Sequence, residues 1–321
     1  MGKRCAESYP CATKQVAIMQ GPRFQSSKAR GAAVIAAMTV VAISAILAAQ
    51  VFERQQLAVR SIENRMDASQ ILWIERAASD WARLILWLDA RTTAIDHLGE
   101  PWAMMVQQTE LDPTVYGGAR AGTKDASAVL TGRIEDAQSR FNLGNLLDKG
   151  KVSVSDVVAL RRLLGVIGLD AGLAEEIAGF AVATGFGRIR DLLSVRGIDL
   201  GSFERLERYV VVLPRRSAVN VNSASAELLY AYLPGLDLTA AQALIKRREK
   251  EAFKDLATLR ARLPEYVHLP AEHFAVTTRF FMMEGVILYG RVSSRARILF
   301  ERNPQPDQDL EAVSVVWRER L

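Results

Sequence analysis

Residue patterns that support catalysis are sparse in this sequence. The three histidines, His97, His268 and His273, do not form a His-Glu-x-x-His or comparable ligand spacing, so no zinc site is expected. Gly117–Lys124 resembles a phosphate loop but places threonine before lysine, and Gly185–Arg190 lacks the third glycine of a dinucleotide fingerprint. No Gly-x-Ser-x-Gly elbow occurs. We therefore expect no enzymatic activity.

One stretch does match a pattern for binding chemistry. Val219–Ser225 and Leu233–Ala240 resemble a helix-hairpin-helix module, in which backbone N–H groups of a Gly-x-Gly turn bind a DNA phosphate. Here Asp237 replaces the second glycine, and its carboxylate would repel that phosphate. The basic residues that follow are interrupted by Glu249 and Glu251. We expect no nucleic-acid partner and interpret the module as a protein-contact domain; a membrane-anchored DNA-binding or uptake protein is the alternative.

The junction Arg30-Gly31-Ala32 predicts processing of the chain. A basic leader ends at Gly31, and residues 32–52 follow without one charge. As a helix, this segment spans roughly 31 Å, enough to cross the hydrocarbon core of a membrane. A secretory signal is cleaved after a shorter apolar segment, whereas here the cleavage-like site precedes it. We therefore expect cleavage after Gly31, as in type IV pilin-like precursors, and retention of the apolar helix.

Charge is unevenly distributed between this leader and the rest of the chain. Residues 1–31 hold six of the 41 basic residues and one of the 36 acidic residues, so the remainder is formally neutral. The pI of about 9.3 is therefore a property of the leader, as expected for a positive flank that stays in the cytoplasm. Both cysteines also lie in the leader, so the remainder can form neither a disulfide nor a thiolate metal site.

Helical patterns dominate the middle of the chain, and strand patterns dominate its end. Residues 32–98 contain no glycine or proline and predict one long helix, ended by Gly99 and Pro101, whose second half packs on a folded domain. Short helices are expected over residues 155–262, with Ser155 and Ser223 as N-caps, and strands at residues 129–134 and after Pro270. The residues expected to mark the buried face of the long helix are Ile62, Met66, Ser69, Trp73, Ala77, Trp81, Leu84 and Leu88.

Several motifs, taken together in the order in which they occur along the chain, resemble those of the general secretion pathway protein K family, the minor pseudopilin K of type II secretion. The longest is Gly132–Leu146, which is similar to the family pattern Gly-x-Ile-x-Asp-x-Gln-Gly-Arg-Phe-Asn-Leu-Asn-Asn-Leu and departs from it at Ser139 and Gly144. The others are Arg30-Gly31-Ala32, Arg54-Gln55-Gln56, Asp96–Ala103, Asn220–Ala224 and Leu233–Gly235. Without the resemblance, the residue types of Asp136, Asn142 and Asn145 predict a structural turn that joins two domains, in which these side chains form hydrogen bonds with backbone groups.

The resemblance implies an α+β fold with a long N-terminal transmembrane and amphipathic helix, a pilin-like antiparallel sheet and an inserted all-α domain of helix-hairpin-helix type. The order of the patterns agrees with this fold. The domain boundaries that we predict are residues 1–31 for a cleaved cytoplasmic leader, 32–52 for the transmembrane part of the helix, 53–136 for the first part of the pilin-like domain, 137–268 for the inserted domain and 269–321 for the C-terminal strands.

The resemblance further implies a non-enzymatic subunit at the tip of the type II secretion pseudopilus. Such a subunit nucleates assembly with other minor pseudopilins, contacts the inner-membrane secretion platform and supports protein export across the outer membrane. Prepilin peptidase would cleave after Gly31, and Ala32 would be N-methylated. The chain would cross the bacterial inner membrane once, with its C-terminal body in the periplasm. Contact with the exported substrate stays open, and a minor subunit of a type IV pilus is a second alternative.

Ala36 bears on the predicted tip position. Major pilin-like subunits carry a glutamate at the fifth mature position, which is Ala36 here, and that carboxylate meets the N-terminal amine of the subunit above. A subunit at the tip has no neighbour above it and needs no such carboxylate.

Calcium is the one cofactor left open. Some members of the family bind it, and hard oxygen donors occur in loops, for example at Asp307, Asp309 and Glu311. No loop matches a calcium-binding pattern, so we expect solvated charges and assign no cofactor.

Overall fold

The computed structural model describes residues 29–111, 128–290, 292–303 and 312–321. It divides the chain into one unit that ends at Ile62 and a second unit, Glu63–Leu321. Helix α1 (Ala29–Thr92) begins in the first unit. From Gly31 onward, α1 is long and apolar enough to cross a membrane, with a mean hydropathy of 2.5 over its most apolar window and none of that window buried.

In the second unit, α1 ends at Thr92, seven residues before the predicted glycine stop. The hydroxyl groups of Thr92 and Thr93 donate hydrogen bonds to the carbonyl oxygen of Asp89, at 3.1 and 3.3 Å. Side chains that bond backbone groups in this way compete with further helical turns, which explains the earlier end.

A five-stranded antiparallel sheet forms the centre of the second unit, with the order β1-β2-β9-β10-β11. Its strands are β1 (Val106–Leu111), β2 (Ala128–Asp136), β9 (Phe280–Tyr289), β10 (Val292–Arg302) and β11 (Val313–Arg320). The predicted strands after Pro270 and at residues 129–134 are confirmed, whereas β1 was not predicted. Because β2 pairs directly with β9, residues 137–279 form an insertion between two neighbouring strands.

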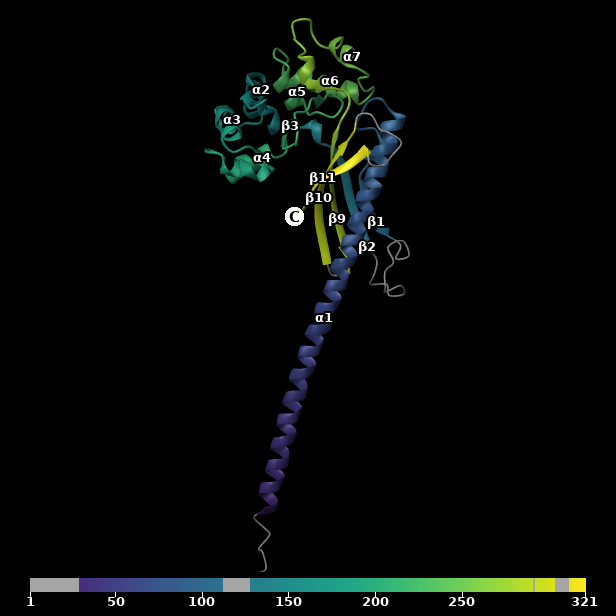
Figure 1. Cartoon of the computed structure of the whole chain (residues 1–321), viewed down its shortest axis with the longest axis vertical. Coiled ribbons are helices and arrows are strands. Elements are labelled where there is room, and N and C mark those ends of the chain that lie inside the picture. Colours follow the sequence, from purple (N-terminus) through teal and green to yellow (C-terminus); the bar gives the residue numbers. More distant parts are fainter. Residues whose placement is uncertain (1–28, 112–127, 291, 304–311) are drawn as a thin grey trace, which may run out of the picture. The chain divides into compact units, whose positions relative to one another are not determined.

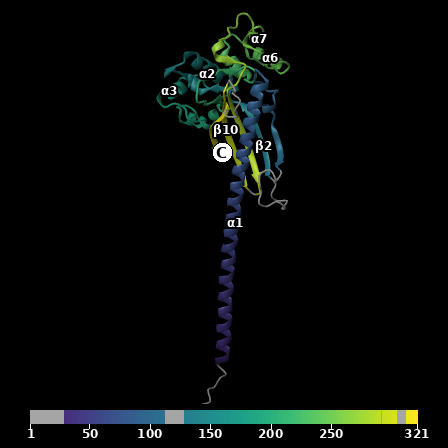
Figure 2. The same ribbon diagram turned by 45° about the vertical axis from the view of Figure 1, so that its right-hand side comes forward.

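The insertion is mostly helical and gathers at one end of the sheet, as both views show (Figures 1 and 2). Its helices are α2 (Val154–Val166), α3 (Leu173–Ala183), α4 (Leu200–Leu206), α5 (Ala226–Tyr232), α6 (Leu238–Arg248) and α7 (Leu256–Arg260). The 3-10 helices of the insertion are η3 (Ala137–Ser139), η4 (Leu143–Leu146), η5 (Ile189–Ser194) and η6 (Ala271–His273). A further 3-10 helix, η1 (Pro101–Ala103), precedes β1 and lies outside the insertion. The two-residue strands are β3 (Phe141–Asn142), β4 (Leu147–Asp148), β5 (Lys151–Val152), β6 (Val210–Val211), β7 (Val219–Asn220) and β8 (Phe274–Ala275). The α+β fold class is thus confirmed.

The N-caps of two insertion helices differ from the prediction. Ser153 occupies the N-cap position of α2, without a capping hydrogen bond from its side chain, and Ser225 occupies the N-cap position of α5; each lies two residues from the predicted serine. Ser225 accepts a hydrogen bond from the backbone N–H of Leu228, as a capping serine does. Ser223 instead donates to a buried carboxylate, which takes it away from the helix end.

Successive residues of β9 point to opposite faces of the sheet and contribute to different hydrophobic clusters. Phe281 and Met283 pack with α1, whereas Phe280 and Met282 pack with Val211 and Leu213 of the insertion. Both faces at this end of the sheet are therefore covered, and the insertion has its own core around Phe141 and α2.

The buried face of α1 is not the predicted one. Ile71, Ile74, Ala78, Ala82 and Leu86 are buried against the sheet. All eight residues of the predicted face are exposed, including Trp73 at 60% and Trp81 at 48%. Alanines at the contact let the helix approach the strands closely, which bulky tryptophans would prevent.

Candidate functional site

The exposed apolar residues of α1 in the second unit are the first candidate for a functional surface. We call Met66, Trp73, Trp81, Leu84 and Leu88 the exposed stripe; each is more than a third exposed. Their spacing of three, four, seven or eight residues places them on one side of the helix. Contiguous exposed apolar surface of this kind marks a contact with another protein or with a membrane.

The predicted processing residues lie on α1 in the first unit. Gly31, Ala32 and Ala36 are all exposed. A Cβ atom at Gly31 would meet no other atom within 4 Å, so packing does not require glycine there. Glycine in a helix is about 1 kcal/mol less favourable than alanine, so its presence calls for a reason other than the helix itself.

Asp136 from the longest sequence motif forms a buried hydrogen-bond centre. Its carboxylate accepts hydrogen bonds from the backbone N–H of Gln138 at 2.7 Å, from Asn220 Nδ2 at 2.8 Å and from Thr278 Oγ1 at 2.6 Å. Ser223 Oγ is a fourth donor. Burial raises the pKa of the Asp136 carboxyl, and the four donors oppose that effect. The Asp136 carboxylate therefore connects two of the sequence motifs, because its donors Asn220 and Ser223 belong to the motif Asn220–Ala224.

Asn142 and Asn145 have the structural role that the sequence predicted. Asn142 Oδ1 accepts hydrogen bonds from the backbone N–H groups of Gly144 and Leu213, and Asn142 Nδ2 donates to the carbonyl oxygen of Arg215. Asn145 makes a reciprocal pair of hydrogen bonds with the backbone of Ser217. These bonds fasten the start of the insertion to residues about 70 positions later, and they confirm the interpretation as a joining turn.

The hairpin that resembles a DNA-binding module uses its own groups internally. Asp237 caps α6 by accepting a hydrogen bond from the backbone N–H of Ala240 at 2.7 Å, so the helix N-terminus already holds an anion. Arg248 donates to the carbonyl oxygen of Val221 at 2.7 Å, and burial lowers its pKa to about 10. Neither group is arranged to bind a phosphate.

The other candidates for catalysis or cofactor binding are not assembled into a site by the described residues. His273 is buried 3.7 Å from Asp156, and His97 lies 3.9 Å from Glu100. In the Gly185–Arg190 loop, the Asp191 carboxylate accepts from the N–H groups of Gly187 and Arg188, so these amides are occupied. The predicted Gly117–Lys124 loop and the acidic residues Asp307, Asp309 and Glu311 lie outside the described residues.

A buried charge cluster at the end of α1 was not foreseen from the sequence. Arg302, at the end of β10, donates from Nη1 to Asp89 Oδ2 at 2.9 Å and from Nη2 to Asp96 Oδ1. Glu100 Oε2 accepts from Trp102 Nε1 at 2.7 Å and from the backbone N–H of His97 at 3.0 Å. Asp96 and Glu100 belong to the sequence motif Asp96–Ala103. Asp89 and Arg302, however, are 213 positions apart, and no local sequence pattern connects them.

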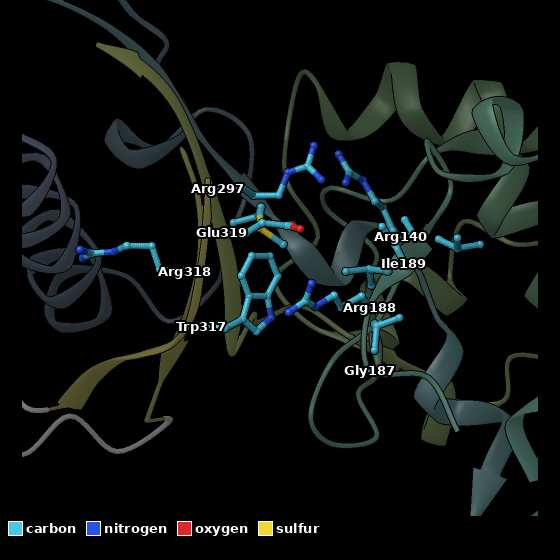
Figure 3. Close-up of a pocket in the computed structure, with 12 residues that line it drawn as sticks. Arg140, Gly187, Arg188, Ile189, Arg297, Trp317, Arg318 and Glu319 are labelled. Atoms are coloured by element: carbon cyan, nitrogen blue, oxygen red, sulfur yellow. The ribbon is translucent and has the colours of Figure 1, made fainter. Parts of the chain in front are cut away.

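A cavity of about 210 Å³ lies between the sheet and the insertion. Figure 3 shows Trp317, Arg188 and Arg297 around it, whereas Arg318 points away. Of the four arginines that line the cavity, three pair with a carboxylate within the protein: Arg140 with Glu135 at 2.5 Å, Arg297 with Glu284 at 3.6 Å and Arg318 with Glu75 at 3.2 Å. The cavity is therefore a contact region of the two parts rather than an anion site.

A long apolar helix that packs by its second half on one face of an antiparallel sheet is a pilin-like architecture. The family model for "Type II secretion system (T2SS), protein K" matches residues 219–274, which include Asn220 and Ser223. The type II secretion system protein K of Pseudomonas aeruginosa is 28% identical over 296 residues, which cover 81% of this chain and 85% of that protein. The protein K of Pectobacterium carotovorum is 26% identical over 275 residues, covering 73% and 79%.

A solved structure agrees with these sequence relatives. A chain in the crystal structure of the GspK–GspI–GspJ complex of enterotoxigenic Escherichia coli has the same fold, with a TM-score of 0.62 at 20% identity. The match covers 80% of this chain and 98% of that one. The resemblance to the type II secretion protein K family is thereby confirmed.

Proposed function

We propose that this chain is a non-enzymatic minor pseudopilin at the tip of the type II secretion pseudopilus. There it nucleates assembly with other minor pseudopilins and supports protein export across the outer membrane. The relatives named protein K and the pilin-like fold support this proposal. The solved chain that shares the fold belongs to a complex of GspK with GspI and GspJ, so a protein of this fold occurs in an assembly with other proteins.

The exposed stripe is the observation that carries the proposal. Trp73 and Trp81 expose about half of their surface on a helix whose opposite side is buried against the sheet. Covering apolar surface gains roughly 25 cal/mol per Å², and exposed tryptophans are frequent anchors of protein interfaces. An apolar helix of another pseudopilin would fit this surface, because residues three and four apart form a continuous ridge.

The first unit fits the membrane step of the same role. Prepilin peptidase would cleave after Gly31, N-methylation would follow at Ala32, and the apolar helix would hold the chain in the inner membrane with its body in the periplasm. The glycine at position 31, which no neighbouring atom requires, supports this assignment. Ala36 supports the tip position, since a tip subunit needs no carboxylate for a neighbour above.

The experiment is co-purification of the full chain, in detergent, with the minor pseudopilins of its own secretion system. We expect a defined complex, and we expect the double variant Trp73→Gln/Trp81→Gln to weaken it by about tenfold or more. The control is Tyr266→Gln, because Tyr266 is 77% exposed but lies in the insertion. Equal recovery of the double variant and wild type would contradict the proposed surface.

A DNA-binding role makes the opposite prediction. Phosphate contacts give an affinity that falls steeply with salt concentration. We expect no retardation of duplex DNA by the full chain at any salt concentration, because Asp237 and Arg248 are occupied within the protein. Tight, salt-sensitive retardation would favour the DNA-binding alternative instead.

A further inference from the structure

The face of the sheet that packs against α1 contains a small hollow beside the helix. Its volume is about 30 Å³, and it lies where Gly132 of β2 and Gly285 of β9 are directly opposite each other. The next pair in the same register is Ile134 with Met283, and both of these residues pack with α1. Because every second residue of a strand points to the same face, the glycine pair also faces α1. Two missing side chains therefore leave a gap in an otherwise apolar surface.

Glycine at position 285 is not required by the fold of the chain itself. Neither Gly132 nor Gly285 has a positive φ, so the backbone conformation requires glycine at neither position. At Gly132, an added Cβ atom would lie 3.2 Å from the carbonyl oxygen of Glu284, which is tight and favours glycine. At Gly285, an added Cβ atom would meet only the carbonyl oxygen of Thr131 among the described residues, at an ordinary contact distance of 3.5 Å. A glycine inside a strand weakens it and often marks a place that another group approaches closely.

The chemistry of the lining suits an apolar group better than water. Trp102 presents its ring to the hollow, because its Nε1–H group donates a hydrogen bond to Glu100. Arg133 also borders the hollow, but its guanidinium pairs with Glu135 and Glu284, and the alternation along β2 directs that side chain to the opposite face. A water molecule needs several polar partners, and an apolar cavity without them stays dry.

The hollow is continuous with the exposed stripe of α1. Trp81 belongs to the stripe and also lines the hollow, and it is 48% exposed. Met104, in the segment before β1, lines the hollow as well and is 69% exposed. These two side chains connect the hollow with the outer surface. A helix that packs along the stripe would therefore pass beside the hollow, and one of its side chains would enter it, as a knob of one helix enters a hole on its neighbour.

We propose that this hollow receives one apolar side chain, similar in size to leucine, from a helix of another minor pseudopilin. The inference rests on the proposed function and deepens it, because the stripe would bind the partner helix and the hollow would fix its position along α1. An apolar side chain gains from burial against these walls and gives up no hydrogen bond on entering. The small volume accommodates the end of a single side chain, which excludes an added strand or loop.

The test fills the hollow from within and measures binding and stability in parallel. In titrations of the full chain in detergent with the minor pseudopilins of its own secretion system, Gly285→Val should weaken binding by about tenfold or more. Its thermal unfolding temperature should stay the same or rise, because valine suits a strand and its Cβ atom has room. Gly285→Ala adds a single methyl group and should weaken binding by roughly threefold, again without loss of stability.

Ser293→Val is the matched control. Ser293 is exposed on the neighbouring strand β10, and its register partner Leu288 points away from the α1 face of the sheet. The substitution adds the same apolar bulk to the same sheet, outside the hollow. It should bind as the wild type does.

A photo-crosslink identifies the occupant. Met104→p-benzoylphenylalanine places a reactive group at the exposed edge of the hollow. After irradiation of the complex, we expect an adduct that mass spectrometry maps to an apolar position on a helix of another minor pseudopilin. Adducts with a second copy of this chain alone would overturn the proposed occupant.

The binding and stability results separate this inference from the proposed function. If the wild type forms the complex and both Gly285 variants bind equally well, the hollow is not a binding site and the proposed function stands. If both variants unfold at a clearly lower temperature, Gly285 serves the fold and the inference is overturned. If the wild type forms no complex at all, the proposed function fails and this inference fails with it.

Discussion

The carboxylate of Asp136 accepts hydrogen bonds from three separate segments of the chain. Gln138 begins the insertion, Asn220 and Ser223 lie in its second half, and Thr278 ends it. One buried residue therefore fixes where the insertion leaves the sheet and where it returns. Its donors would each lose a partner if the carboxylate were removed.

Asp136→Ala should destabilise the protein strongly for this reason. Four buried donors would be left without an acceptor, at a cost of about 3 kcal/mol or more, which corresponds to a thermal unfolding temperature lower by roughly 6 to 12 °C. The measurement is thermal unfolding of the full chain in detergent. Asp255→Ala is the control, because Asp255 is an exposed cap of α7 whose donors can bond water instead; a loss as large as that of Asp136→Ala would contradict the argument.

The sequence predicted the roles of residues that lie within one continuous motif. It did not predict the roles of residues whose partners are distant along the chain. Asp136, Asn142 and Asn145 lie within one continuous motif, and turn-forming residue types indicated their backbone contacts. Asp89 and Arg302 are partners only because α1 and β10 pack together. Nothing in either local sequence indicates the other.

Helix α1 shows the same limit at the scale of elements. Its existence followed from the absence of glycine and proline, but the choice of buried face required knowledge of its partner. Their size and apolar character predicted Trp73 and Trp81 at the contact, whereas Ala78 and Ala82 are the residues that pack against the sheet. Two-residue strands such as β3 and β6 were also missed, because two residues show no alternation.

Neighbouring substitutions on α1 test this assignment of faces. Ala82→Leu should overpack the contact with the sheet and cost about 1 to 3 kcal/mol, because Ala82 is fully buried. Trp81→Leu, one residue earlier, should leave the unfolding temperature nearly unchanged because Trp81 is about half exposed. Thermal unfolding of the two full-length variants provides the comparison, and the reverse order of stability would refute the described faces.

The whole molecule should tolerate removal of its apolar segment. The unit Glu63–Leu321 has its own sheet, insertion and hydrophobic clusters, and residues 31–52 contribute no buried side chain. We expect residues 57–321 to be soluble, with a cooperative thermal transition followed by circular dichroism. Aggregation of this fragment, or a transition without cooperativity, would show that the division lies elsewhere.

Processing is the second prediction at this scale. Gly31→Leu should block cleavage by a co-expressed prepilin peptidase, so that the precursor keeps its mobility and its N-terminal mass. Ala33→Leu serves as the control, since it changes an equally exposed neighbour without changing the predicted cleavage residue. A normally shortened Gly31→Leu product would place the cleavage site at another peptide bond.

The position of the insertion also has a kinetic consequence. Strands β2 and β9 are neighbours in space but are separated by the whole of residues 137–279, so their pairing must close a very long loop. Closing long loops is slow, because chain entropy is lost before distant contacts form. If the helical insertion collapses around its own core first, it brings Asp136 and Thr278 together and turns that long closure into a short one. The sheet would then be the last part of this chain to form, and the molecule would become competent to assemble only once the sheet is complete.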